Sequence, residues 1–232
     1  MAGVIVIGAG PGIGLSVARR FGGEGLPVGV LARSAGTVEH AVAALAGLDV
    51  PVAGVTADAG DETTLRAALD QLADRFGVPD VLVYNAAIIQ WDALGELSAR
   101  QHLDAWAVNV VGAITAAAHV GPRMAEAGRG TIVITGGMPT PVPDVTSLSL
   151  GKAGVRALTE LLATRFGPSG VHVATVTVAG AVAPGTAFDP DDIAELYWRL
   201  HAQPANAWER EVLYTGDEPA QPSSGVRSTF IP

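Results

Sequence analysis

Residues 4–14 read Val-Ile-Val-Ile-Gly-Ala-Gly-Pro-Gly-Ile-Gly, an apolar β-branched run that passes directly into a cluster of glycines. Together with the amphipathic stretch that follows, this pattern predicts a strand, a tight turn and a helix. Glycines let the backbone turn sharply and approach a ligand with no Cβ in the way, and the start of a helix offers free N–H groups to a pyrophosphate. The expected nucleotide contacts are Gly8, Pro11, Gly12, Ile13 and Gly14. A turn without a ligand fits the same residues.

The composition is that of a compact globular protein. Hydrophobic residues make up 49% and charged residues 16% of the 232 residues, which is enough apolar material for one large core. A net charge of -9 argues against nucleic acid and anionic membrane surfaces as partners. The absence of cysteine excludes disulfides and thiolate chemistry.

No targeting or membrane-spanning segment is expected. Met1 runs almost straight into the first predicted strand, which leaves no room for a signal peptide and favours a cytoplasmic protein. The longest apolar stretch, residues 105–118, is interrupted by Asn109 and is too short to span a bilayer. We interpret this stretch as a buried helix.

Strand-like and helix-like segments alternate along the chain. Strands are predicted at residues 4–7, 27–32, 50–56, 81–84, 131–135, 171–178 and 211–214, and helices at residues 13–21, 37–46, 62–76, 99–127, 149–166 and 191–201. Such alternation predicts a parallel sheet with helices on both faces. We therefore expect a single doubly wound Rossmann-type α/β domain over residues 1–215, with a mostly parallel seven-stranded sheet. Residues 216–232 lose this periodicity and are expected to form a mobile or partner-docked tail.

Polar residues follow the second and third predicted strands, where an open α/β sheet binds its ligands. Arg33 and Ser34 follow the second strand, and an arginine there suits a 2′-phosphate, so NADP(H) is preferred to NAD. A solvated loop charge is the alternative for Arg33. Asp58 follows the third strand and is placed either to accept from an adenine amino group or to cap the helix that starts near Asp61.

The fourth predicted strand ends in small residues with one amide. Asn85, Ala86 and Ala87 leave space for a ribose, and the Asn85 amide is suited to bracing neighbouring strands. These residues complete the predicted cofactor half of the site.

The chain resembles the short-chain dehydrogenase/reductase family from its start to about residue 214. The segments that carry the resemblance are Gly8-x3-Gly12-Ile13-Gly14, Asp58, Asn85-Ala86-Ala87, Asn109 within residues 108–112, and Leu148-x3-Lys152. The resemblance implies a nicotinamide cofactor, a small-molecule substrate and a homodimer or homotetramer. It also implies that Lys152 bonds the nicotinamide ribose, and it places Gly180, Val182 and Thr186 beside the cofactor.

Two positions depart from the family pattern. The resemblance implies a proton relay of Asn, Ser, Tyr and Lys, in which the Tyr passes a proton to the substrate oxygen. Asn109 and Lys152 match that relay, but the Ser position is Gly137 and the Tyr position is Leu148. Leucine transfers no proton, so the ordinary relay is absent. Asn109 also fits a structural amide at a helix kink.

Two neighbouring residues are candidates for a substitute acid. Asp144 is the better acid, because burial would raise its pKa into a useful range, and Ser149 lies next to the lost tyrosine position. For each of them, a residue at a helix start is the favoured interpretation. The five histidines have no spacing that suits a metal, so no metal site is expected.

Several aromatic and apolar residues have two interpretations. Trp91 and Trp106 are expected to pack around the long middle helix. Tyr197, Trp198 and Trp208 either form a lid over the substrate or belong to the core, with core packing favoured for at least two of them. The apolar positions of the helix after Ser149, which include Leu161, resemble the family's dimer face, although burial against the sheet explains them as well.

The leading functional hypothesis is an NADP(H)-dependent oxidoreductase with an unusual proton donor. Hydride transfer needs only a nicotinamide positioned against an electrophile, such as a carbonyl, an imine or an activated enone. The alternatives are a non-redox NADP(H)-binding sensor or scaffold, and a non-redox isomerase or cyclase on the same fold.

Overall fold

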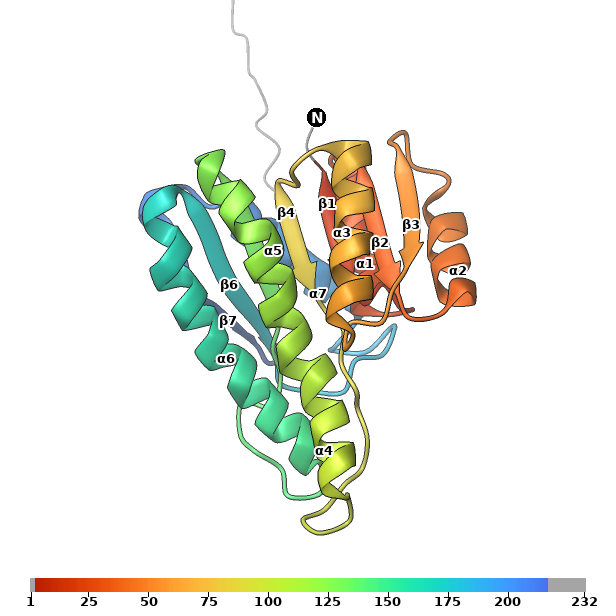
Figure 1. Cartoon of the computed structure of the whole chain (residues 1–232), viewed down its shortest axis with the longest axis vertical. Helices are drawn as coiled ribbons and strands as arrows, with labels where there is room; N and C mark the ends of the chain where they lie inside the picture. Colours follow the sequence, from red (N-terminus) through yellow and green to blue (C-terminus); the bar gives the residue numbers. More distant parts are fainter. Residues whose placement is uncertain (1–2, 217–232) are drawn as a thin grey trace, which may run out of the picture.

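The computed structural model describes residues 3–216, which form one α/β domain around a single parallel sheet (Figure 1). The seven strands are ordered β3-β2-β1-β4-β5-β6-β7, and every neighbouring pair is parallel. The strands are β1 (Val4–Ile7), β2 (Val28–Ala32), β3 (Val52–Thr56), β4 (Val81–Tyr84), β5 (Gly130–Thr135), β6 (Val171–Val178) and β7 (Glu211–Tyr214). The predicted doubly wound fold is confirmed, with an all-parallel sheet. Apart from residue 216, the predicted tail lies outside the described residues.

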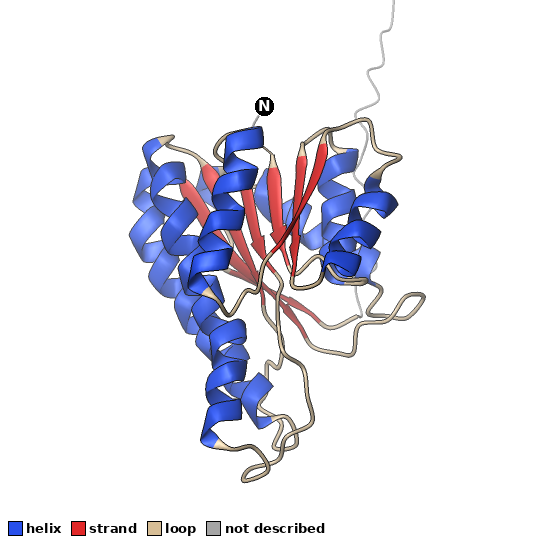
Figure 2. Cartoon of the chain, turned by 45° about the vertical axis from the view of Figure 1, so that its right-hand side comes forward, coloured by secondary structure: helices blue, strands red, loops and turns tan. Residues whose placement is uncertain are grey.

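Helices cover both faces of the sheet (Figure 2). The helices are α1 (Ile13–Gly23), α2 (Ala35–Leu45), α3 (Glu62–Phe76), α4 (Ala99–Trp106), α5 (Gly112–Glu126), α6 (Thr146–Phe166) and α7 (Pro190–Ala202). One apolar core joins the sheet to α1, α2 and α7, and a second joins it to α3, α5 and α6. Figure 1 shows α3, α5 and α6 side by side over the second face. The apolar strands are buried because both of their faces meet helices.

The long middle helix is continuous but not uniform. Residues Ala107–Val111 form a π-helical segment, η1, between α4 and α5. By length and composition alone, the whole stretch Ala99–Glu126 is sufficient to cross a membrane, although half of its most apolar window (50%) is buried inside the domain. The helix is therefore longer than the apolar residues 105–118 indicate. It packs against α3 and α6, as a core helix does.

The glycine turn brings α1 very close to β1. A Cβ at position 14 would overlap the Gly8 carbonyl oxygen and lie 2.9 Å from Ala9 Cα. Gly8 itself has a positive φ of 87° and touches the backbone at Ala86, where an added Cβ would lie 2.5 Å from the nitrogen. Only glycine permits both approaches, so the turn depends on residue type at these two positions.

The start of α6 is held from a distant loop. Asp92 accepts a hydrogen bond from Ser147 N at 2.8 Å, and its backbone exchanges hydrogen bonds with Asp144 and Thr146. Asp92 is completely buried, and its second carboxylate oxygen has no partner among the described residues. The helix therefore begins at Thr146, three residues earlier than predicted, because a side chain from outside the segment bonds one of its first N–H groups.

The close approach of α1 to β1 predicts that substitutions at two glycines of the same turn differ in their effect on stability. In Gly14→Ala the new methyl group meets fixed backbone atoms, so we expect unfolding free energy to fall by about 1–3 kcal/mol. Gly10 has no heavy atom within 4 Å of the built Cβ. Gly10→Ala should therefore change stability by less than about 0.5 kcal/mol in the same urea titration. Equal stability of the two variants would contradict this account of the turn.

Candidate cofactor and active site

A chain of hydrogen bonds joins four segments at the carboxyl edge of the sheet. Lys152 Nζ donates to Thr135 O at 2.7 Å, and Thr135 Oγ1 donates to Asn85 Oδ1 at 2.9 Å. Asn85 Nδ2 then donates to Gly8 O at 2.8 Å. The chain links α6, β5, the end of β4 and the glycine turn across the point where strand order reverses, between β1 and β4. This reversal is where open α/β sheets form a ligand crevice.

The first turn of α1 is suited to an anion. Gly12, its N-cap, has a φ of 132° and no side-chain hydrogen bond to the helix start. A Cβ at Gly12 would meet nothing within 4 Å, so no side chain crowds this helix start. Free N–H groups and a positive helix end fit a pyrophosphate. Pro11 is exposed, and Ile13 is half-buried beside them.

Three polar residues lie at the adenine end of the predicted site, and each has different contacts. Arg33 is exposed and makes no ion pair within residues 3–216. Ser34 caps α2, because its Oγ accepts from Thr37 N at 3.2 Å. Asp58 accepts from Gly60 N at 2.8 Å, and the α3 cap is Asp61.

Two cations on α6 hold the loop after β5. Lys152 is half-buried and bonds the Thr135 carbonyl, while Arg156 Nη1 donates to Gly137 O at 2.8 Å and Met138 O at 3.2 Å. Burial is the main cause that lowers the pKa of Lys152 to about 8, and the positive charge of Arg156 adds to the effect. The site therefore contains an ammonium group that titrates near neutral pH.

Asn109 lies on η1 and is fully engaged by the loop after β4. Its Oδ1 accepts from Ile88 N at 2.7 Å, and its Nδ2 donates to Ile88 O at 3.2 Å. Asn109 is buried, and a Cβ at Gly151 of α6 would lie 2.8 Å from the Asn109 Cβ. The amide thus ties the π-helical segment to the loop that begins with Asn85, Ala86 and Ala87.

The positions at which the resemblance led us to expect the family's Tyr and Ser, Leu148 and Gly137, are both buried. Leu148 lies one turn before Lys152 on α6. Gly137 has a φ of 151°, and a Cβ there would lie 3.6 Å from Lys152 Cε. A side chain at residue 137 would therefore face the lysine stem, but the backbone conformation favours glycine.

The two predicted substitute acids are not arranged as acids. Ser149 is buried, and its hydroxyl both accepts from Val142 N at 3.0 Å and donates to Val142 O at 3.2 Å. Asp144 is exposed, so it lacks the burial on which its expected role as an acid depended. Both side chains lie at the entrance of α6.

The loop after β6 carries the remaining predicted cofactor contacts. Gly180, Val182 and Thr186 are all exposed. The Thr186 hydroxyl donates to Ala183 O at 2.8 Å and accepts from Phe188 N at 3.1 Å, which closes a local turn. These residues form an exposed loop beyond the carboxyl end of β6.

Two of the three aromatic side chains of the C-terminal half belong to the core. Tyr197 is completely buried, and its hydroxyl lies 2.6 Å from Thr135 Oγ1. Trp198 packs edge-on against Phe21 at the same core. Trp208 is half-buried and stacks on a histidine of β6. The expectation for Trp91 is wrong, since its side chain is 82% exposed on the long loop before α4, away from helix packing.

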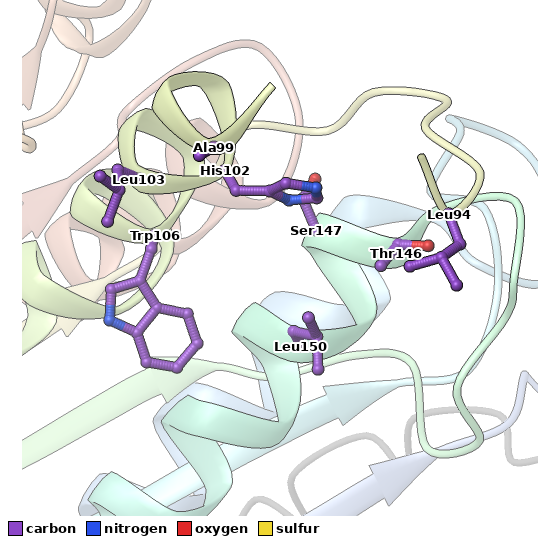
Figure 3. Close-up of a pocket in the computed structure, with 8 residues that line it drawn as sticks. All are labelled: Leu94, Ala99, His102, Leu103, Trp106, Thr146, Ser147 and Leu150. Carbon is purple, nitrogen blue, oxygen red and sulfur yellow. The ribbon is translucent and has the colours of Figure 1, made fainter. Parts of the chain in front are cut away.

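An apolar hollow lies between α4 and α6 (Figure 3). Its volume is about 650 Å³. The lining residues are Leu94, Ala99, His102, Leu103, Trp106, Thr146, Ser147 and Leu150. Neither Lys152 nor Asn109 lines this hollow, so it is separate from the hydrogen-bonded chain described above.

Sequence reasoning missed two residues that shape the site. Arg156 follows Lys152 by one helical turn, and that spacing was a signal that both cations reach the same loop. Asp92 gave no such signal, because its contact with Ser147 joins loops that are far apart in sequence. Within residues 3–216, no group of three His, Asp or Glu side chains is arranged to hold a metal ion.

Comparison with known proteins places this geometry in one family. The family model described as short chain dehydrogenase matches residues 2–190. D-threitol dehydrogenase from Mycolicibacterium smegmatis is 30% identical over 175 residues, which cover 75% of this chain and 67% of that protein. 2-(R)-hydroxypropyl-CoM dehydrogenase from Xanthobacter autotrophicus is 33% identical over 208 residues, which cover 84% and 77%.

A solved structure is similar over almost the whole chain. The crystal structure of a metagenomic short-chain oxidoreductase in complex with NADP superposes with a TM-score of 0.83 at 25% identity, covering 91% of this chain and 96% of that one. The family model, the relatives and the fold agree over most of the sequence. The chain therefore belongs to the short-chain dehydrogenase family.

Proposed function

We propose that this protein is an NADP(H)-dependent oxidoreductase that acts on a small carbonyl, imine or enone-like substrate without the family's Tyr and Ser. The single observation that carries the proposal is the hydrogen-bonded chain from Lys152 through Thr135 and Asn85 to Gly8. It places the lysine at one end of the strand-order reversal and the anion-suited turn at the other. When bound, the nicotinamide cofactor supplies the hydride.

The residues of the turn and of the strand ends bind different parts of the proposed cofactor. The first turn of α1 takes the pyrophosphate through its free N–H groups. Asp58 accepts from the adenine, and Lys152 bonds the nicotinamide ribose. Arg33 takes the 2′-phosphate, and its exposure together with the lack of an ion pair in the described residues supports that role.

The charge of Arg33 predicts a preference for NADPH over NADH, which substitution of Arg33 should abolish. Arg33→Ala removes a charged hydrogen-bond donor from the 2′-phosphate, so the Kd of NADPH should rise about 10- to 100-fold while that of NADH stays unchanged. Quenching of tryptophan fluorescence measures both affinities. Arg75→Ala, which removes an exposed arginine of α3, is the matched control and should alter neither value. Equal affinity of the unaltered protein for NADPH and NADH would contradict the assignment of Arg33.

A non-redox NADP(H)-binding sensor or scaffold is the second candidate. The buried hydrocarbon of Leu148 at the family's acid position favours it, because the bound nucleotide would then lack a hydroxyl acid beside it. The two candidates differ in whether bound NADPH is consumed. Binding alone therefore cannot separate them, and turnover can.

Turnover of an activated carbonyl distinguishes the candidates. An oxidoreductase should oxidise NADPH in the presence of phenanthrenequinone. The loss of absorbance of the reduced nicotinamide measures the rate. Leu148→Tyr should raise that rate about tenfold or more, because it restores a hydroxyl one turn from Lys152. Tight binding with no oxidation by either protein would favour the sensor.

We also propose that the protein is a homo-oligomer that pairs through α4, α5 and α6. Three large apolar side chains on these helices are exposed: Leu103 (64%), Leu150 (56%) and Leu161 (69%). Trp106 and Ile114 extend this face and are also partly exposed. A second copy of the chain would remove these apolar side chains from water.

The apolar helix face predicts which substitution separates the subunits. A charge in Leu161→Glu would be buried by pairing, so the dissociation constant of the oligomer should rise about tenfold or more. Light scattering during gel filtration measures the mass. Leu213→Glu, at another exposed leucine, on the edge strand β7, should leave pairing through the helices intact. A monomeric unaltered protein would refute the proposal.

A further inference from the structure

Reduction of a carbonyl leaves an oxyanion that must receive a proton, and Leu148 cannot supply one. The described residues near Lys152 offer few other acids. The Ser149 hydroxyl is occupied on both sides by the Val142 backbone. The Asn109 amide is occupied in the same way by Ile88, and Asp144 is exposed at the entrance of α6. None of these side chains has a free proton directed into the site.

The two nearest tyrosines are also committed. Tyr84 donates to Val108 O, and burial raises its pKa well above the usual range. The Tyr197 hydroxyl pairs with Thr135 inside the core formed with α1 and α7, and burial raises its pKa as well. Both phenols therefore hold their protons in contacts that maintain the fold.

Lys152 differs from all of these groups. Its ammonium has three N–H donors, and one of them bonds Thr135 O; no other hydrogen bond of this group is found within residues 3–216. Gly137 has no side chain, and a Cβ built there would lie 3.6 Å from Lys152 Cε, in van der Waals contact with the lysine stem. Two N–H groups of the ammonium therefore remain for a substrate oxygen.

The electrostatic surroundings keep the ammonium able to release its proton. Arg156 is the charged group that acts on Lys152, and it stays in place because the Gly137 and Met138 carbonyls accept from it. The neighbouring strand β5 presents a carbonyl and η1 presents an amide, and no carboxylate of the described residues contributes to the shift. Burial and Arg156 bring the pKa to about 8, so the proton is both present and transferable near neutral pH.

We propose that the Lys152 ammonium is itself the proton donor to the substrate oxygen, replacing the acid that position 148 lacks. This inference rests on the proposed oxidoreductase function, in which hydride addition generates the oxyanion. An N–H bond of Nζ breaks, its electron pair remains on nitrogen, and an O–H bond forms on the substrate. Water then reprotonates the neutral amine. In the oxidative direction the neutral amine accepts the same proton.

The sequence offers a direct measurement of this group, because Lys152 is the one lysine among the 14 Lys and Arg residues. Protein grown on ¹³C-labelled lysine gives a single ε-carbon signal in NMR spectra. Its titration midpoint is expected near pH 8. Arg165→Lys adds an exposed lysine on the same helix, which should titrate near about 10.4 as an internal reference. A Lys152 midpoint equal to the reference would overturn the proposal.

Kinetics with phenanthrenequinone and NADPH test the transfer itself. The rate of reduction should be constant below pH 8 and fall roughly tenfold per pH unit above it, because the neutral amine cannot donate. Lys152→Arg keeps the positive charge but does not release a proton, so its rate at saturating NADPH should fall about 100-fold or more. Saturating NADPH is used because Lys152 also bonds the nicotinamide ribose in the proposed site.

The possible failures are distinguishable. A flat pH profile, or a Lys152→Arg rate within about threefold of the unaltered protein, overturns the role of Lys152 while the oxidoreductase function stands. Absence of NADPH binding in calorimetry overturns the proposed function first. Bound NADPH that is never oxidised at any pH contradicts both.

Discussion

The hydrogen bond from the Asn85 amide to the Gly8 carbonyl is the contact on which the site depends. It fixes the glycine turn against the end of β4, while the Asn85 carbonyl oxygen receives the Thr135 hydroxyl from β5. Three neighbouring strands thus end in one bonded unit at the strand-order reversal. Because Gly14 and Gly8 have no side chains, α1 and the β4 loop approach this unit closely.

The second constraint is the pair of cations on α6. Lys152 and Arg156 lie one helical turn apart, and both bond carbonyl groups of the loop that follows β5. Asp92 holds the first turn of the same helix, so the position of these cations is set at both the loop and the helix start. Burial disfavours the charged state of the lysine, and the positive charge of Arg156 adds to the effect, which explains the lowered pKa of its ammonium.

Much of the fold was predictable because alternating apolar runs and amphipathic stretches leave little choice of architecture. Strand 81–84 and helix 62–76 were predicted with the bounds that the structure has. The predicted amide brace of Asn85 is also present. Errors arose where residues distant in sequence act together: α6 starts early because Asp92 bonds its first turn. Asp144 is exposed because its loop runs over the surface, and no local pattern reveals that.

The central proposal is that a phosphorylated nicotinamide nucleotide binds at the carboxyl edge of this sheet. Isothermal titration calorimetry of the folded protein with NADPH tests it most directly. We expect one binding site per chain with micromolar affinity, and weaker binding of NADH. No heat from reduced or oxidised NADP at millimolar concentration would contradict the account and leave only the fold.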